Sequence, residues 1–133
     1  MEVLKQLLSE ELTLMLRTWN YHWNLEGAQF ASLHKLLETQ YDELADLVDE
    51  VAERIRALGG VAETKVNLEI TKLVPLAEML KDLISANEGI SKKMRTESIP
   101  VLDKANDIGS VDLLTRALQQ HDKAAWMLRA SAK

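Results

Sequence analysis

Cysteine is absent from this chain of 133 residues, which excludes disulfide bonds and thiolate sites for zinc or iron–sulfur clusters. The sequence also lacks any apolar run near the ~20 residues that a membrane-spanning helix needs. Its first residues do not combine a basic region with an apolar stretch, as a secretory signal would. We therefore expect a protein of the reducing cytoplasm that has no membrane partner.

Residues that interrupt helices are scarce. The chain has five glycines and two prolines, and hydrophobic residues make up 47% of it. This composition predicts long helices that bury a core. The length suits one domain and is too short for two ordinary ones, so we expect a single domain over residues 1–133.

Positive charge is in deficit, since 16 Lys and Arg residues against 21 Asp and Glu residues give a net charge of -5. This balance disfavours nucleic acid and anionic lipid as partners and allows attraction of cations. The helical pattern begins by Val3 and the sequence ends at Ala132-Lys133, so we expect no basic arm. Because DNA affinity comes from lysines and arginines that neutralise phosphates, we predict weak or no DNA binding.

Hydrophobic periodicity predicts two long helices in the first half of the chain. The first covers about residues 2–25, and the second extends from Phe30 to Leu58, where Gly59 and Gly60 favour a helix end. The residues expected to face inward are Leu4, Leu8, Leu12, Met15 and Trp19 in the first helix, and Phe30, Leu33, Leu37, Tyr41, Leu44, Val48, Val51, Ile55 and Leu58 in the second.

Two more helices are predicted in the second half. The third begins at Pro75, and we expect Pro100 to kink or end it. The fourth follows Gly109 with Ser110 as its N-cap. Residues 61–74 are compatible with a strand or with a short helix. The expected fold is all-α, a four-helix bundle whose long second-to-third connection allows a crossover. Inward-facing residues are expected to be Leu76, Leu80, Leu83, Ile90 and Met94, then Val111, Leu114, Leu118, Ala125 and Leu128.

Two histidines and two acidic residues provide imidazole and carboxylate, the ligand types that suit iron. They are His22, His34, Asp49 and Glu53. An unbroken helix would separate His34 from Asp49 by roughly 22 Å, whereas metal–ligand bonds are about 2 Å long. Either the two pairs do nothing together, or each completes a site with the other pair from a neighbouring subunit.

The same residues also allow a purely structural interpretation. His34 and Glu38 are four positions apart, as are Asp49 and Glu53, so each pair shares a helix face. Such pairs are most often the solvated flank of a helix. His22 lies in an aromatic-rich helix end, where a backbone group could satisfy its ring.

The remaining histidine, His121, looks like a surface residue without a role. The residues three positions before the histidines are Trp19, Ala31 and Leu118. Ferritin-type di-iron bundles use Glu-x-x-His pairs within one bundle. We therefore do not expect a di-iron site inside a single copy of this chain.

Several longer runs together resemble one family. They are His22-Trp23-Asn24-Leu25-Glu26-Gly27, then Phe30, Leu33 and His34, Asp49-Glu50-Val51-Ala52-Glu53-Arg54-Ile55, Leu58-Gly59-Gly60, Asp112-Leu113-Leu114-Thr115, His121-Asp122-Lys123 and Trp126-Met127-Leu128-Arg129. These runs are similar to the Dps family, the DNA-binding proteins from starved cells or mini-ferritins. The likeness covers nearly the whole chain.

The resemblance implies a ferritin-like four-helix bundle with a short extra helix in the second-to-third connection. Twelve such subunits would form a hollow shell. Ferroxidase centres would lie at its two-fold interfaces, where His22 and His34 of one subunit bind iron together with Asp49 and Glu53 of its partner. The centre implied by the resemblance therefore agrees with the distance argument.

The implied activity is that of an oxidoreductase that oxidises Fe(II) and stores a ferric mineral. The usual oxidant in the family is hydrogen peroxide, with dioxygen as the alternative, so the reaction protects against oxidative damage. Trp23 would lie beside the centre as an oxidisable aromatic residue. Glu38 stands where the family usually has aspartate and could bind iron directly or through a water, which leaves a second iron in question.

Cations must also cross the implied shell. Acidic residues near the junction of the third and fourth helices are candidates for a three-fold pore: Glu97, Asp103, Asp107 and Asp112. Asp112 is equally compatible with capping of a helix N-terminus. Two other functions remain open, a structural helical oligomer and a nucleoid-compacting DNA-binding protein, and the net charge disfavours the second.

Overall fold

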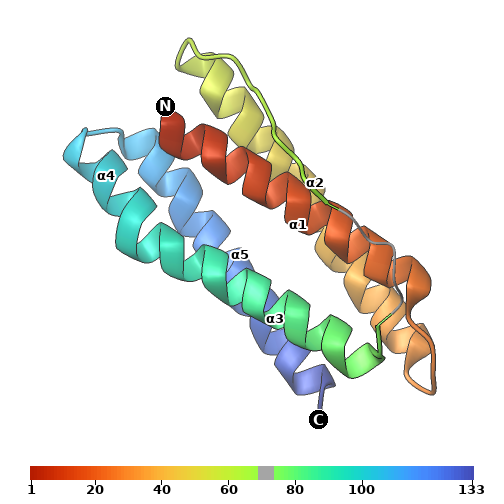
Figure 1. Cartoon of the computed structure of the whole chain (residues 1–133). Helices are drawn as coiled ribbons and strands as arrows, with labels where there is room; N and C mark the ends of the chain where they lie inside the picture. Colours follow the sequence, from red (N-terminus) through yellow and green to blue (C-terminus); the bar gives the residue numbers. More distant parts are fainter. Residues whose placement is uncertain (69–73) are drawn as a thin grey trace. The chain divides into compact units, whose positions relative to one another are not determined.

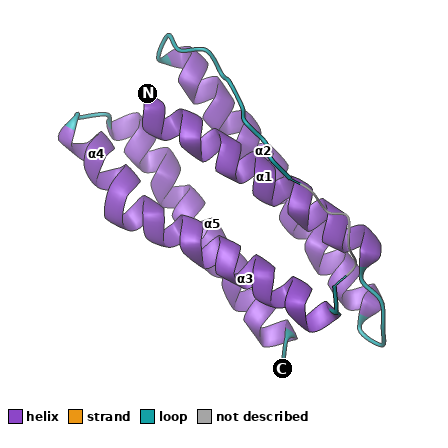
Figure 2. Ribbon diagram, viewed as in Figure 1, coloured by secondary structure: helices purple, strands orange, loops and turns teal. Residues whose placement is uncertain are grey.

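The computed structural model describes residues 1–68 and 74–133, and every regular element within these ranges is helical (Figures 1 and 2). The elements are α1 (Glu2–Asn24), α2 (Phe30–Ala57), α3 (Leu76–Lys93), the π-helical turn η1 (Met94–Ser98), α4 (Ile99–Lys104) and α5 (Ile108–Ser131). The expected all-α class is confirmed. None of the described helices is long and apolar enough to cross a membrane. The chain divides into two compact units, Met1–Met79 and Leu80–Lys133.

In the first unit, α1 and α2 pack along one another (Figure 1). The prediction for α1 was partly wrong, because Leu12 and Met15 are only half-buried and Trp19 is 37% exposed. Polar Thr18 lies on the buried face instead, and its hydroxyl donates to the Leu14 carbonyl at 2.8 Å. The buried residues are Leu4, Leu7, Leu8, Glu11, Leu14, Thr18 and His22 in α1, and Leu33, Leu37, Gln40, Leu44, Leu47, Val51 and Ile55 in α2.

Gly59 ends α2 as predicted. It takes a left-handed conformation with φ of 86°, which favours glycine. Its N–H donates to the Arg56 carbonyl at 3.0 Å, and the Gly60 N–H donates to the Ile55 carbonyl at 2.9 Å. These two bonds make a Schellman motif that satisfies carbonyls left over at the helix end.

The chain then returns along α1. The backbone N–H of Lys65 donates to Ser9 Oγ at 2.9 Å, and Lys5 Nζ lies 3.9 Å from a Glu63 carboxylate oxygen. Residues 60–68 contain no helix, so the short helix expected in this connection is not found in that part. The rest of the expected segment, residues 69–73, lies outside the described residues.

In the second unit, Pro100 does not end the helix, but it changes the hydrogen bonding of the turn before it. The π-helical turn η1 precedes it, with the Ile99 N–H donating to the Met94 carbonyl, and α4 continues to Lys104. A wider turn accommodates a proline, which lacks an N–H and clashes with the preceding turn.

The N-cap of α5 is Asp107, not Ser110 as predicted. The Asp107 carboxylate accepts a hydrogen bond from the Ser110 N–H at 3.2 Å, while Ser110 is fully buried. Aspartate satisfies the free N–H groups of a helix start as well as serine does. Asn106 just before it has φ of 58°, which lets the chain turn sharply between α4 and α5.

The expectation that His121 is a surface residue was wrong. Its side chain is 1% exposed, and its Nδ1 lies 2.8 Å from Asn87 Oδ1 on α3. The Asn87 amide in turn donates to the Leu83 carbonyl at 2.8 Å. His121 is therefore a buried polar contact between α5 and α3.

Ile55 provides a test of the α1–α2 packing. Its side chain is fully buried, so Ile55→Ala should cost about 2–5 kcal/mol and lower the midpoint of thermal unfolding. Leu58, one turn later, is 41% exposed, and Leu58→Ala should change stability by only ~0.5 kcal/mol. Equal midpoints for the two variants, measured at one protein concentration, would contradict the described core.

Candidate metal centre

His22 and His34 form a closely matched pair at the turn that joins α1 and α2. Their imidazole rings stack with centroids 3.6 Å apart and planes inclined by 14°. His22 Nδ1 lies 2.7 Å from the His34 carbonyl oxygen, and His34 Nδ1 lies 2.7 Å from the His22 carbonyl oxygen. The two residues therefore exchange ring-to-backbone hydrogen bonds in both directions.

The end of α1 explains one of these bonds. The last carbonyls of a helix lack an N–H partner within it. The Tyr21 carbonyl accepts from the Leu25 N–H, but the carbonyl of His22 lies beyond the reach of any further helical N–H. The His34 ring provides that missing donor, so the local fold itself brings the two histidines together.

The same bonds determine the protonation of the rings. A carbonyl oxygen only accepts, so each Nδ1 must carry the hydrogen and donate it. Each Nε2 then keeps its lone pair and is available to a metal ion. Bonding of the second ring nitrogen to a backbone carbonyl is the arrangement that orients histidine ligands in metal sites.

Aromatic side chains surround the pair. Tyr41 meets the His22 ring edge-on with centroids 5.1 Å apart, and Phe30 stacks on His34 at 4.8 Å. Trp19 lies 5.5 Å from Tyr41 and 5.2 Å from Trp23. Trp23 is 57% exposed, so it lies at the outer edge of the group.

Glu38 lies one turn beyond His34 on α2 and is bound by a cation of the same helix. Lys35 Nζ donates to a Glu38 carboxylate oxygen at 3.0 Å. This hydrogen bond, together with the charge of Lys35, lowers the pKa of Glu38, and the two histidines lower it further. Loss of water around its ring raises the pKa of Tyr41, and the charges of Glu38 and Asp42 add to that effect.

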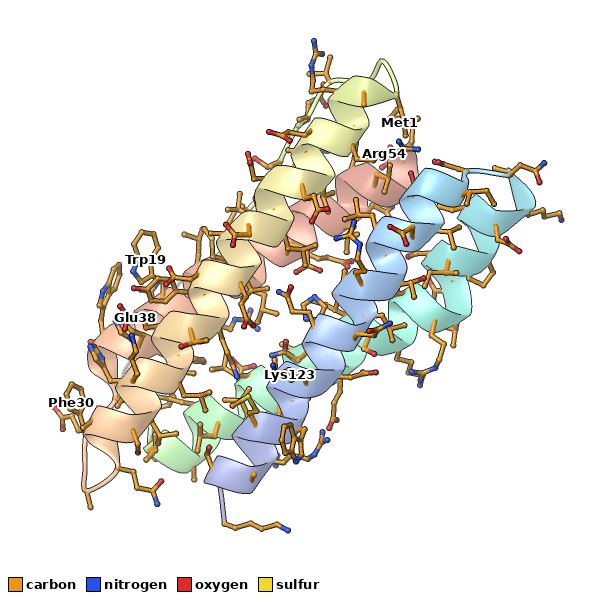
Figure 3. The ribbon with its side chains drawn as sticks, turned by 180° about the vertical axis from the view of Figure 1, so that it is seen from behind. Met1, Trp19, Phe30, Glu38, Arg54 and Lys123 are labelled. Atoms are coloured by element: carbon orange, nitrogen blue, oxygen red, sulfur yellow. The ribbon has the colours of Figure 1, made fainter. Side chains whose placement is uncertain are left out.

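Asp49 and Glu53 lie near the other end of α2 and are exposed. Figure 3 shows Trp19, Phe30 and Glu38 at one end of the α1–α2 pair and Arg54, next to Glu53 in sequence, far along the helix. Because α2 is unbroken from Phe30 to Ala57, the axial separation of roughly 22 Å between the histidine and the acidic pair applies. Among residues 1–68 and 74–133, no three His, Asp or Glu side chains gather closely enough to hold a metal ion.

The four pore candidates lie in the second unit. Asp107 is the N-cap of α5, and Asp112 pairs with Arg116 one turn later at 3.3 Å, so the expected capping role belongs to Asp107 and not Asp112. Glu97 in η1 and Asp103 in α4 are exposed.

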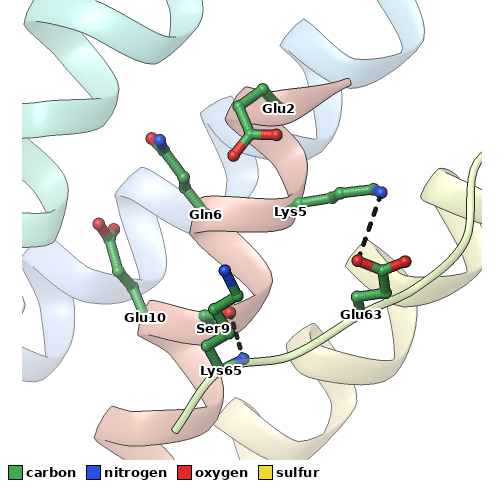
Figure 4. A pocket seen from close by; sticks show the side chains of 7 residues that line it. All are labelled: Glu2, Lys5, Gln6, Ser9, Glu10, Glu63 and Lys65. Carbon is green, nitrogen blue, oxygen red and sulfur yellow. Dashed lines mark hydrogen bonds and ion pairs between the residues drawn. The ribbon is translucent and has the colours of Figure 1, made fainter. Parts of the chain in front are cut away.

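An open groove of ≈ 450 Å³ lies elsewhere, between the first turns of α1 and the segment that returns along it (Figure 4). Its lining includes Glu2, Lys5, Ser9, Glu10, Glu63 and Lys65. None of these lining residues is among the predicted ligands, and charges of both signs are mixed within the groove.

No role of Lys35 was predicted from the sequence, and Tyr41 was predicted only as part of the apolar stripe. The spacing of three positions between Lys35 and Glu38 is a usable signal, because residues three apart on a helix are neighbours. The contact of Tyr41 with His22 joins different helices, so no spacing within the sequence reveals it.

The ring protonation can be measured directly. Solid-state NMR of metal-free protein labelled in its three histidines should show His22 and His34 as the form protonated at Nδ1, because both Nδ1 atoms donate to carbonyls. Single His→Gln variants would assign the signals. A neutral form protonated at Nε2 in either residue would contradict the described pair.

Comparison with known proteins agrees with this architecture. A model of the ferritin-like domain matches residues 1–133. The DNA protection during starvation protein 2 of Bacillus anthracis is 35% identical to this chain, over 97% of the chain and 93% of that protein. An uncharacterized low temperature-induced protein of Nostoc is 34% identical, over 96% of the chain and 76% of that protein.

A solved structure extends the likeness to three dimensions. The X-ray structure of Dps from Thermosynechococcus elongatus has a TM-score of 0.88 and 30% sequence identity, and the match covers 99% of this chain and 90% of that one. The described residues are all-helical, as this fold requires. The chain therefore belongs to the Dps family of mini-ferritins and has their ferritin-like four-helix bundle fold.

Proposed function

We propose that this protein oxidises Fe(II) and stores the ferric product inside a hollow shell of twelve subunits. Membership of the Dps family supports iron storage and protection against oxidative damage in general terms. The ferroxidase step is the more specific part of the proposal. It rests on the histidine pair, whose Nε2 atoms are left available for a metal ion by the bonds at Nδ1.

The proposed centre needs two copies of the chain. His22 and His34 supply two imidazoles, but the acidic pair Asp49 and Glu53 lies too far along the same unbroken helix to reach them. A symmetric dimer would bring the histidines of one copy against the acids of the other. By symmetry the same interface would hold two such centres.

The ligand types suit the reaction. Imidazole and carboxylate bind Fe(II), and the harder Fe(III) favours the carboxylate oxygens once an electron has left. With hydrogen peroxide as oxidant, two Fe(II) ions each lose one electron, and the peroxide takes up both electrons and two protons to give two waters. No hydroxyl radical is released when both electrons are delivered.

Trp23 has a proposed accessory role. It is exposed and joined through Trp19 and Tyr41 to the His22 ring by successive ring contacts. Through this chain of rings, Trp23 would donate an electron to the oxidant when Fe(II) does not supply it.

Entry of cations would use acidic residues of the second unit. Glu97 and Asp103, both exposed, are the stronger of the four candidates, because Asp107 and Asp112 already contact Ser110 and Arg116. We place the activity in the cytoplasm, and we infer that it does not depend on DNA, given the net charge of -5.

Subunit complementation tests the shared centre. One variant, His22→Ala/His34→Ala, lacks the imidazoles, and a second, Asp49→Asn/Glu53→Gln, lacks the carboxylates. Each alone should lose most peroxide-dependent Fe(II) oxidation, measured by ultraviolet absorbance of the ferric product. Co-assembly of equal amounts should restore about a quarter of the centres, because half of the random dimers are mixed and each mixed dimer contains one intact centre of two.

The control is the same pair of variants mixed after assembly, when subunits no longer exchange. Activity that stays absent in the co-assembled sample would disprove the shared centre. Full activity in either variant alone would show that the substituted residues take no part in iron oxidation, as expected of a purely structural oligomer.

Light scattering tests the shell. We expect a particle of roughly twelve times the 15.0 kDa chain mass, because closed assembly is what gives the mineral an enclosed space. A monomer under the same conditions would contradict both the shell and the shared centre.

A further inference from the structure

The Glu38 carboxylate has a partner that the family resemblance does not supply. Lys35 Nζ contacts it at 3.0 Å across one turn of α2. The Lys35 side chain is 74% exposed and that of Glu38 is 37% exposed, so the pair lies at the edge of the protein and water reaches it.

This pair lies on the same face of α2 as one of the histidines, because His34 and Glu38 are four positions apart on an unbroken helix. Figure 3 shows Glu38 at the same end of α2 as Trp19 and Phe30, the aromatic residues around the histidine pair. Glu38 is thus a carboxylate on the histidine side of α2 that also binds an internal cation.

We infer that Lys35 is a specificity-determining residue that competes with the second metal ion of the centre. The inference rests on the proposed function. A first metal ion held by the histidine pair and the partner's acidic pair, without Glu38, leaves the contact between Lys35 and Glu38 intact. A second ion that uses Glu38 must first displace the ammonium group from that carboxylate.

The expected effect is modest. Exposed ion pairs contribute little, because water screens them and two long side chains must be ordered. Removal of the ammonium should therefore strengthen second-site binding by about two- to five-fold. Lys35 would in this way favour centres with one ion when metal is scarce and permit two when it is abundant.

Cobalt titration of the assembled protein tests the inference. Co(II) alone is added to the parent and to Lys35→Met, and its visible absorbance reports the two binding steps. We expect Lys35→Met to leave the first step unchanged and to tighten the second by about two- to five-fold. Lys35→Arg, which keeps the positive charge, should behave as the parent does.

Two controls separate this effect from general changes in charge. Lys65→Met removes one lysine far along the chain, beside Ser9, and should change neither step. In a Glu38→Gln background, Lys35→Met should no longer tighten the second step, because the carboxylate that links the two effects is gone. Light scattering on each variant verifies that assembly is intact.

The inference is overturned if Lys35→Met and the parent show the same second step, or if the gain persists in the Glu38→Gln background. Both results leave the proposed function standing, provided that the first step still depends on His34. Cobalt binding that is unchanged when His34 is substituted would instead contradict the proposed centre itself.

Discussion

Two hydrogen bonds, from the ring of His22 to the backbone of His34 and from the ring of His34 to the backbone of His22, determine how α1 joins α2. One of them supplies the donor that the end of α1 lacks. Both direct Nδ1 toward the protein and Nε2 away from it. A single local arrangement thus completes the fold of the turn and, in the proposed centre, orients two imidazoles for a metal ion.

The length of α2, which is one continuous helix, imposes the second constraint. The histidine pair is at its beginning and the acidic pair Asp49 and Glu53 is near its end, separated by about four turns of helix. The helix is not interrupted anywhere within Phe30–Ala57. Under the proposed function, each subunit would therefore contribute two separate halves of a centre, and the chemistry would be a property of the assembly rather than of the single chain.

Much of the fold followed from the sequence, because glycines and hydrophobic spacing are strong local signals. The end of α2 at Gly59 and the extents of α1 and α2 were predicted correctly, whereas the start of α5 was not. The buried face of α1 was not, because Thr18 satisfies its hydroxyl within the helix and so tolerates burial. His121 was mistaken for a surface residue, because its partner Asn87 is on another helix. The positions of the metal ligands stay predictions, whereas the stacking of His22 on His34 needed the structure.

The π-helical turn before Pro100 affects the hydrogen bonding of the backbone. Proline cannot donate a hydrogen bond, so a carbonyl one turn earlier is deprived of its helical amide. The residues there, from Arg95 to Glu97, are exposed, and water is the available donor. The proline therefore falls where its missing amide is least destabilising, on an exposed turn rather than in the core.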